Sequence, residues 1–221
     1  MAAPHFAITG LRWTGTATLA IGCLLVAAYA FAFLNLRPFN PDDPFMVRFA
    51  LLGLPVPMHF FGAGLALLLV PLQASTVVRR RWPTLHRIGG GLSVGGILVG
   101  GIGGLVMAFS SHRGWVTGLG FGILAVLWLM TMALGVRAIV RRDIAAHRRW
   151  MLRCMALTAG AITLRIILGV GFGALQLPFD TVYIFAAWAS WLFNLAVVEA
   201  WLQWQARRPL PRLASALALR G

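Results

Sequence analysis

The sequence predicts an all-α protein, a polytopic membrane bundle of six transmembrane helices whose two termini both lie in the cytoplasm. Three observations lead to this prediction. Hydrophobic residues make up 60% of the 221 residues and charged residues only 11%, whereas a soluble domain carries roughly 25% charged residues. Six apolar segments are long enough to cross a bilayer, which takes about 20 residues. The 19 basic residues, all of them arginine, gather in alternate loops.

The predicted helices follow one another through short loops, with no second domain. Their expected bounds are 17–34, 57–78, 85–110, 119–140, 150–172 and 182–204. Together they form one transmembrane domain, 17–204, between an N-terminal cytoplasmic tail, 1–16, and a basic cytoplasmic tail, 205–221. The first segment also resembles a signal peptide with a cleavage site at Ala28–Ala30. Because its apolar run continues beyond that point, we expect it to be retained as a helix.

Arginine placement sets the expected orientation through the positive-inside rule. Four segments carry most of the arginines: Arg12; Arg79, Arg80, Arg81 and Arg87; Arg137, Arg141, Arg142, Arg148 and Arg149; and Arg207, Arg208, Arg212 and Arg220. The opposite side carries Arg37, Arg48 and Arg113. Membrane orientation therefore explains the net charge of +14 better than nucleic-acid binding does. We expect the lipid bilayer, and no nucleic acid, as a partner.

The third predicted helix is rich in glycine. Gly91 and Gly95, Gly96 and Gly100, and Gly100 and Gly104 are each four residues apart. This spacing lets helix backbones approach closely, and close packing holds helices together in lipid. Because the glycines occupy more than one face, we expect this helix to be the central one. A cofactor lying against the smooth face is the alternative to helix packing.

Two of the expected cytoplasmic turns share a pattern. The segments 80–87 and 141–148 both read R-R-x-x-x-x-H-R. The spacing places His86 and His147 at the same depth, about one helical turn inside the membrane interface. The two hairpins that contain these turns are therefore candidates for an internal duplication, although the many arginine pairs also make a chance match easy.

Histidines at this depth are candidate haem ligands. A bis-histidine haem b needs two neutral imidazoles facing each other across a helix bundle, and His86 and His147 meet that requirement. Arg87 or Arg153 would then pair with the propionates, because a guanidinium suits a carboxylate. A quinone bound at the same groups is an alternative. A second alternative is a structural role, in which the histidines form hydrogen bonds with lipid phosphates or loop carbonyls.

Other polar residues lie deeper in the predicted spans, where each is costly and therefore a functional candidate. His59 is the second choice as a ligand, unless it bonds a carbonyl freed by Pro55 or Pro57. Arg165 needs a negatively charged partner, for which Glu199, Asp180 and a bound anion are the candidates. The remaining polar intramembrane residues are Gln73, Asn194 and Glu199.

Several short stretches resemble a known family. They are PLQ at 71–73, LHRIGG at 85–90, AHRRWMLR at 146–153, LR at 164–165 and W-x-x-W-x-x-N at 188–194. Their pattern, from about residue 59 to 204, is similar to the bacterial multi-pass proteins of domain-of-unknown-function family 2306. The resemblance implies a bacterial inner-membrane protein and no established reaction. The matching positions are His59, Gln73, His86, Arg87, His147, Arg148, Trp150, Met151, Arg153 and Arg165. His112 is not among them, and the usual LHRxxGR reads LHRIGGG here.

These observations together favour a small redox-type membrane protein that binds haem b or a quinone at the paired His-Arg turns. The alternative is a non-catalytic accessory subunit of a larger complex, or a small-molecule carrier built on Arg165 and Glu199. The sequence contains no phosphate-binding loop, nucleophile elbow or CxxC motif, so whether the protein is an enzyme stays open.

Overall fold

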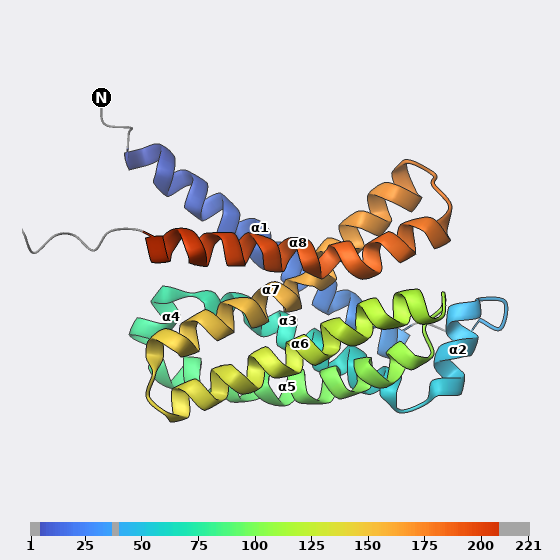
Figure 1. Cartoon of the computed structure of the whole chain (residues 1–221), viewed down its shortest axis with the longest axis horizontal. Coiled ribbons are helices and arrows are strands. Elements are labelled where there is room, and N and C mark those ends of the chain that lie inside the picture. The colour runs from blue at the N-terminus through green and yellow to red at the C-terminus, as the bar shows by residue number, and fades with distance from the viewer. Residues whose placement is uncertain (1–4, 37–39, 208–221) are drawn as a thin grey trace, which may run out of the picture.

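The computed structural model describes residues 5–36 and 40–207, without the side chains of 5–14, 16, 36 and 44. In this part of the chain every regular element is helical, as predicted (Figure 1). The elements are α1 (His5–Leu36), α2 (Pro44–Leu52), α3 (Pro55–Ala74), α4 (Thr76–Arg81), α5 (Pro83–Phe109), α6 (Trp115–Val140), α7 (Ile144–Leu168), the π-helical turn η1 (Gly169–Ala174) and α8 (Phe179–Arg207).

Six helices are long and apolar enough to cross a membrane, which confirms the predicted number: α1, α3, α5, α6, α7 with η1, and α8. Some bounds differ from the prediction for local reasons. The second expected span divides after Ala74, because the Ser75 hydroxyl accepts from the Val78 N–H at 3.2 Å and starts α4. Similarly, Asp143 accepts from the Ala146 N–H at 2.8 Å and starts α7 before the expected position.

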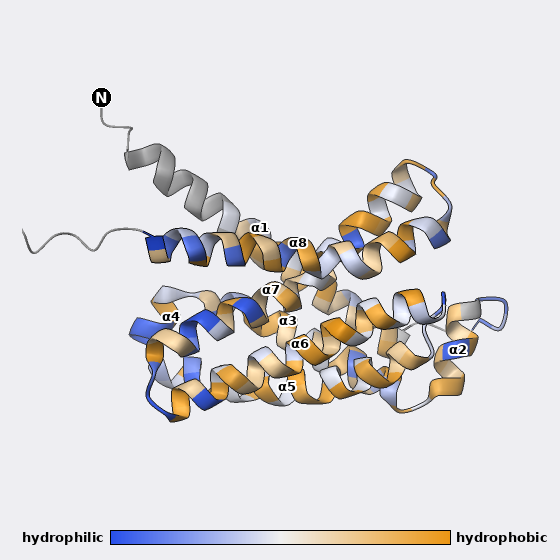
Figure 2. Cartoon of the chain, viewed as in Figure 1, coloured by the Kyte–Doolittle hydropathy of each residue, from blue (hydrophilic) through white to orange (hydrophobic). Residues whose placement is uncertain are grey.

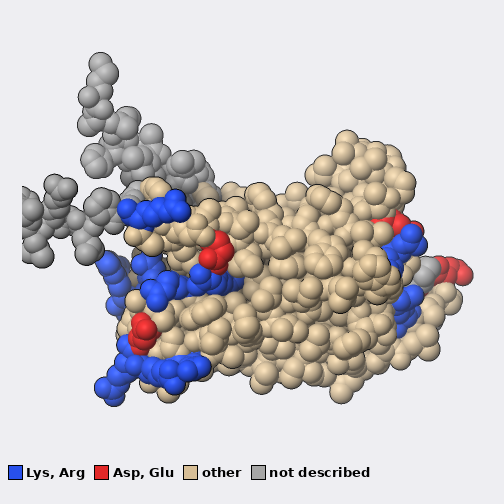
Figure 3. Space-filling model, in the orientation of Figure 1, with Lys and Arg blue, Asp and Glu red and all other residues tan. Residues whose placement is uncertain are grey.

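The polar residues gather at the two ends of the bundle, and the middle is apolar (Figure 2). Most arginines of the described chain lie at the end formed by α4, the α6–α7 turn and the last turns of α8 (Figure 3). We call this the arginine end, and the opposite end, beside α2, the cavity end. The N-terminal end of α1 lies at the arginine end too (Figure 1). The side chain of Arg12 and residues Arg37, Arg208, Arg212 and Arg220 lie outside the described residues.

Four helices form a closed ring. α3 packs against α5, α5 against α6, α6 against α7, and α7 against α3. α1 lies outside the ring against α3 and α7, and α8 lies outside it against α6 and α7. The buried core runs through the ring at Ala66, Ile97, Trp128, Met132, Cys154 and Leu157, with Trp191 from α8. α5 and α7 therefore stand diagonally across the ring from each other.

Glycines bring α3 and α5 close together, as their spacing predicts. A Cβ at Gly96 would lie 2.9 Å from the Gly62 carbonyl oxygen, and one at Gly100 would lie 2.6 Å from the Ala63 nitrogen. In contrast, Gly95 faces open space. The prediction that this helix is central is wrong, because α5 packs against α3, α4 and α6 only on part of its surface. Its remaining face presents exposed aliphatic side chains to the lipid, and α7 instead contacts helices on several sides.

Candidate functional site

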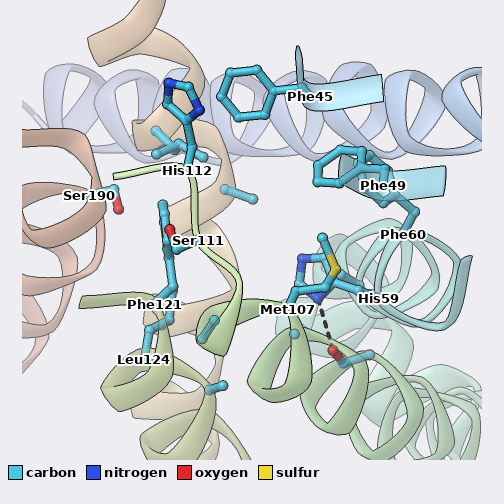
Figure 4. A pocket seen from close by; sticks show the side chains of 18 of the residues that line it. Phe45, Phe49, His59, Phe60, Met107, Ser111, His112, Phe121, Leu124 and Ser190 are labelled. Carbon is cyan, nitrogen blue, oxygen red and sulfur yellow. Dashed lines mark hydrogen bonds between the residues drawn. The ribbon is translucent and has the colours of Figure 1, made fainter. Parts of the chain in front are cut away.

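A cavity of about 510 Å³ occupies the cavity end of the four-helix ring. Residues of α3, α5, α6 and α7 form its inner wall, and residues of α1, α2 and α8 complete it. Figure 4 shows rings from several of these helices pointing into the same space. The aromatic lining residues are Tyr29, Phe33, Phe45, Phe49, Phe60, Phe121, Trp128, Phe179 and Tyr183.

The short helix α2 lines the cavity at the end of the bundle opposite the arginine end and forms its cover (Figure 1). Asp43 starts it by accepting from the Phe45 N–H at 2.9 Å. Arg48 then donates to the carbonyl oxygens of Ser110, at 2.8 Å, and Ser111, at 2.9 Å. Ser110 and Ser111 directly follow α5, and the Ser111 oxygen also accepts from the Gly114 N–H at 3.1 Å. The guanidinium of Arg48 therefore ties α2 to the end of α5.

Ring contacts and an ion-pair cluster hold the rim of the cavity. The Phe45 ring centroid lies 4.6 Å from that of His112. His112 Nε2 lies 3.1 Å from Asp180, and Arg113 lies 3.2 Å from the second oxygen of the same carboxylate. His112 thus shares the cavity with His59, and its Nε2 is engaged by Asp180.

His59 lies on the cavity wall with one ring nitrogen fixed. Its Nδ1 lies 2.8 Å from the carbonyl oxygen of Gly100 on α5 (Figure 4). A carbonyl only accepts, so Nδ1 carries the proton and, in the neutral ring, Nε2 is an acceptor. Gly104 makes room for the ring, since a Cβ there would lie 2.7 Å from Nδ1. His59 does bond a backbone carbonyl, but not one freed by the prolines of its own helix.

Arg165 lines the same cavity, and its guanidinium carbon lies 4.8 Å from the centre of the Tyr29 ring. No described residue forms a hydrogen bond or an ion pair with it. Both carboxylates that we expected as partners are engaged elsewhere. Asp180 belongs to the rim cluster, and Glu199 pairs with Arg153. Of the three candidate partners for Arg165, the two carboxylates of the chain are therefore wrong, and a bound anion stays a prediction.

Arg153 and Glu199 form a two-point ion pair between α7 and α8. Arg153 Nε and Nη2 donate to the two carboxylate oxygens, the latter at 2.9 Å. The guanidinium carbon also lies 4.9 Å from the Trp150 ring centre. α7 and α8 run in opposite directions, so positions near the start of α7 meet positions near the end of α8. This reversal brings Glu199 level with Arg153 and away from Arg165.

The two turn histidines lie at the arginine end, far along the ring from the cavity. His147 Nδ1 lies 2.8 Å from the carbonyl oxygen of Gly135. His86 Nδ1 is buried and has no partner among the described residues, while the side chain of Arg87 is exposed. The two turns also differ in structure, because α4 precedes His86 and no helix separates α6 from α7.

The other predicted polar residues join helices to one another. Gln73 Nε2 donates to the main-chain oxygen of His86 at 3.1 Å, linking α3 to α5. Asn194 on α8 donates to the Ala156 oxygen at 3.2 Å and accepts from the Thr163 hydroxyl at 3.0 Å. These bonds satisfy the polar groups in lipid, so they indicate a structural role.

The structure distributes the predicted site residues between two regions of the bundle. Of the six candidates for cofactor binding, only His59 and Arg165 line the cavity; His86, Arg87, His147 and Arg153 do not. The residues that it missed are the aromatic side chains and Arg48 of α2. The sequence signals that could have found them are the mixed apolar and basic segment 44–54 and the phenylalanines in and near it. In the described chain no three His, Cys, Asp or Glu side chains gather as a metal site.

The family described as "Predicted membrane protein (DUF2306)" matches residues 56–202, about two thirds of the 221 residues. The chain belongs to this family. The DUF2306 region starts at the second residue of α3 and ends within α8, so it contains the rest of the four-helix ring with His59 and Arg165. The α2 cover and the Tyr29 ring beneath Arg165 lie outside the DUF2306 region. No curated protein and no solved structure matches the chain.

Proposed function

We propose that this multi-pass DUF2306 protein binds a small amphipathic molecule within the membrane, in the cavity beside Arg165. One observation carries this proposal: the guanidinium of Arg165, which has no ionic partner among the described residues, faces an aromatic cavity of about 510 Å³. Ligand cavities are commonly about 300 to 1,000 Å³, mostly apolar, with a few polar groups that orient the ligand. A charge inside a membrane protein is costly and usually marks a binding or transport pathway.

We also infer the orientation of this site. The arginine end would face the cytoplasm of a bacterial inner membrane, with both termini on that side, because positively charged loops are retained there. The cavity would then lie in the outer half of the bilayer. A ligand would reach it from the outer side or from the outer lipid leaflet.

A quinone is one ligand class that suits the cavity. Its flat ring would pack among the aromatic side chains, and its carbonyl oxygens would accept hydrogen bonds from Arg165. The Nε2 of a neutral His59 would accept a hydrogen bond from a hydroxyl of the reduced quinone. This moves the expected quinone site from the His-Arg turns to the cavity end, and it keeps a redox role as a proposal.

The binding test uses protein in lipid nanodiscs and three probes that share a ten-carbon chain: decanol, decanoate and decylubiquinone. We expect at least one probe to raise the unfolding temperature. Leu164→Trp, which fills part of the cavity, should abolish this shift. Leu192→Trp at an exposed position on α8 is the matched control and should keep it. No shift with any probe up to its solubility limit would overturn the proposal.

Haem b at His86 and His147 is a second candidate, favoured by their positions on diagonally opposed helices of the ring. The Nδ1 of His147 bonds to a carbonyl and leaves Nε2 for a metal, as ligating histidines usually do. His86 lacks such a bond. Visible spectra of the oxidised and reduced protein provide the test. A Soret band lost in His147→Ala supports haem, and a colourless preparation from haem-replete cells contradicts it.

The accessory-subunit interpretation makes a different prediction for the same two experiments. A protein that only supports a partner membrane protein would show neither a probe-dependent stabilisation nor a Soret band. Copurification of a stable partner under mild solubilisation would then favour that interpretation.

A further inference from the structure

We infer that the molecule in the cavity is an anion: a monovalent amphipathic carboxylate whose headgroup pairs with Arg165 and whose apolar body lies among the aromatic rings. This inference rests on the proposed function and names its ligand class. It depends on where the carboxylates of the chain are, on which cations are already engaged, and on how the guanidinium of Arg165 is held.

The whole chain contains five acidic side chains, and each of them lies in the described part. Asp43 and Asp143 start α2 and α7. Asp180 holds the rim cluster, Glu199 holds Arg153, and Asp42 is exposed in the loop before α2. None forms an ion pair with Arg165. A side-chain carboxylate to balance this charge must therefore come from another molecule.

The other cationic groups near the cavity already have polar partners within the chain. Arg48 directs its Nη1 to the two carbonyls at the end of α5. Arg113 pairs with Asp180 on the rim. A neutral His59 offers the cavity an acceptor, which would repel a bare carboxylate oxygen. Among the cationic side chains that line the cavity, Arg165 is the one that forms no hydrogen bond with a described residue, so it is the site we assign to a headgroup with a single negative charge.

The Tyr29 ring positions the guanidinium of Arg165 so that it can bind such a partner. The Tyr29 ring covers one face of it at 4.8 Å, a stacking that leaves the N–H groups on the edge free. In the described chain the one buried side-chain polar atom without a partner is His86 Nδ1. Because the guanidinium nitrogens of Arg165 have no described partner and are not among the buried atoms, they are accessible, and we infer that they are accessible from the cavity that the residue lines. An arginine edge of this kind binds a carboxylate through two parallel hydrogen bonds.

The test compares decanoate with decanol and decylubiquinone in nanodiscs, with partitioning into empty nanodiscs subtracted. We expect decanoate to bind about tenfold to a hundredfold more tightly than decanol, the range for a charge-assisted bond. Arg165→Gln should remove this preference while decanol binding stays within about twofold. Arg165→Lys should retain part of it, because a lysine keeps the charge and loses the second hydrogen bond.

Each outcome separates this inference from the function on which it rests. Decanol or decylubiquinone binding as tightly as decanoate would overturn the anion and leave the binding function intact. A decanoate preference that persists in Arg165→Gln would also overturn it. Absence of binding by all three probes would overturn both. Retained decanol binding in the variant shows that the fold survived the substitution.

Discussion

Arg153 and Arg165 lie on the same transmembrane helix, twelve residues apart, or about 18 Å along the axis. Each guanidinium stacks on an aromatic ring, Trp150 at 4.9 Å and Tyr29 at 4.8 Å. They differ in their ionic partners. Arg153 donates hydrogen bonds to both carboxylate oxygens of Glu199. Arg165 pairs with no carboxylate among the described residues and faces a cavity.

The difference shows that two charges on the same membrane-spanning helix can differ in whether a carboxylate of the chain balances them. A charge balanced by the chain's own carboxylate contributes to helix packing, because both desolvated groups are satisfied. A charge left without a counter-ion keeps its desolvation cost until something else balances it. The assignment of a role to each arginine thus depends on the partner and not on depth in the membrane.

The contrast between Arg153 and Arg165 depends on the packing of the four-helix ring. Gly96→Val is the substitution that we expect to disturb this packing most. The new Cβ would lie 2.9 Å from the Gly62 oxygen, forcing α3 and α5 apart. Overpacking of this kind costs about 1 to 3 kcal/mol or more. Gly95→Val at the neighbouring open position carries the same change in helix propensity and should remain near wild type. Thermal unfolding in nanodiscs distinguishes the two, and equal losses would contradict the close α3–α5 contact.

The ion pair at Arg153 should show the next largest effect. Glu199→Gln leaves this guanidinium uncompensated and should lower the free energy of unfolding by about 1 to 3 kcal/mol, less than for a fully buried pair because both side chains are partly exposed. The double variant Arg153→Met/Glu199→Met should recover most of the loss. A double variant no better than Glu199→Gln would show that the pair is not the cause.

Loosening the α2 cover should have a smaller, local effect. Arg48→Gln removes two hydrogen bonds to the end of α5 and should destabilise α2 by about 1 to 2 kcal/mol. Hydrogen exchange of the α2 amides should speed up accordingly, while exchange in the middle of α6 stays unchanged. Faster exchange throughout the ring would mean that Arg48 supports the whole bundle.

The smallest stability effect is expected at Arg165 itself. Without ligand, Arg165→Gln removes a charge that no carboxylate balances, so the unfolding free energy should change by less than about 1 kcal/mol or rise. Arg153→Gln is the matched control on the same helix and should be clearly destabilising. If both variants lose the same stability, Arg165 is a structural residue and the contrast between the two positions disappears.

Much of the fold was predictable from local properties. The six spans follow from apolar length alone, and the close α3–α5 contact follows from glycines four residues apart. The surroundings of the candidate site depended more on tertiary packing. Arg165 and His59 were singled out as costly polar groups, but the carboxylate partner, the aromatic wall and the α2 cover were not identified. Partners on other helices depend on which helices are neighbours and at what depth, and neither is encoded in local spacing.

The amino-acid sequence by itself determined the class of protein, the number of crossings and the separation of an arginine-rich side from the other. These depend on hydrophobicity, length and charge along the chain, which act one segment at a time. Only the tertiary structure decided that Glu199 meets Arg153 and that Arg165 faces a cavity. The antiparallel packing of α7 and α8 determines the partner of Glu199, because it brings residues that are distant in the sequence to the same depth in the bundle.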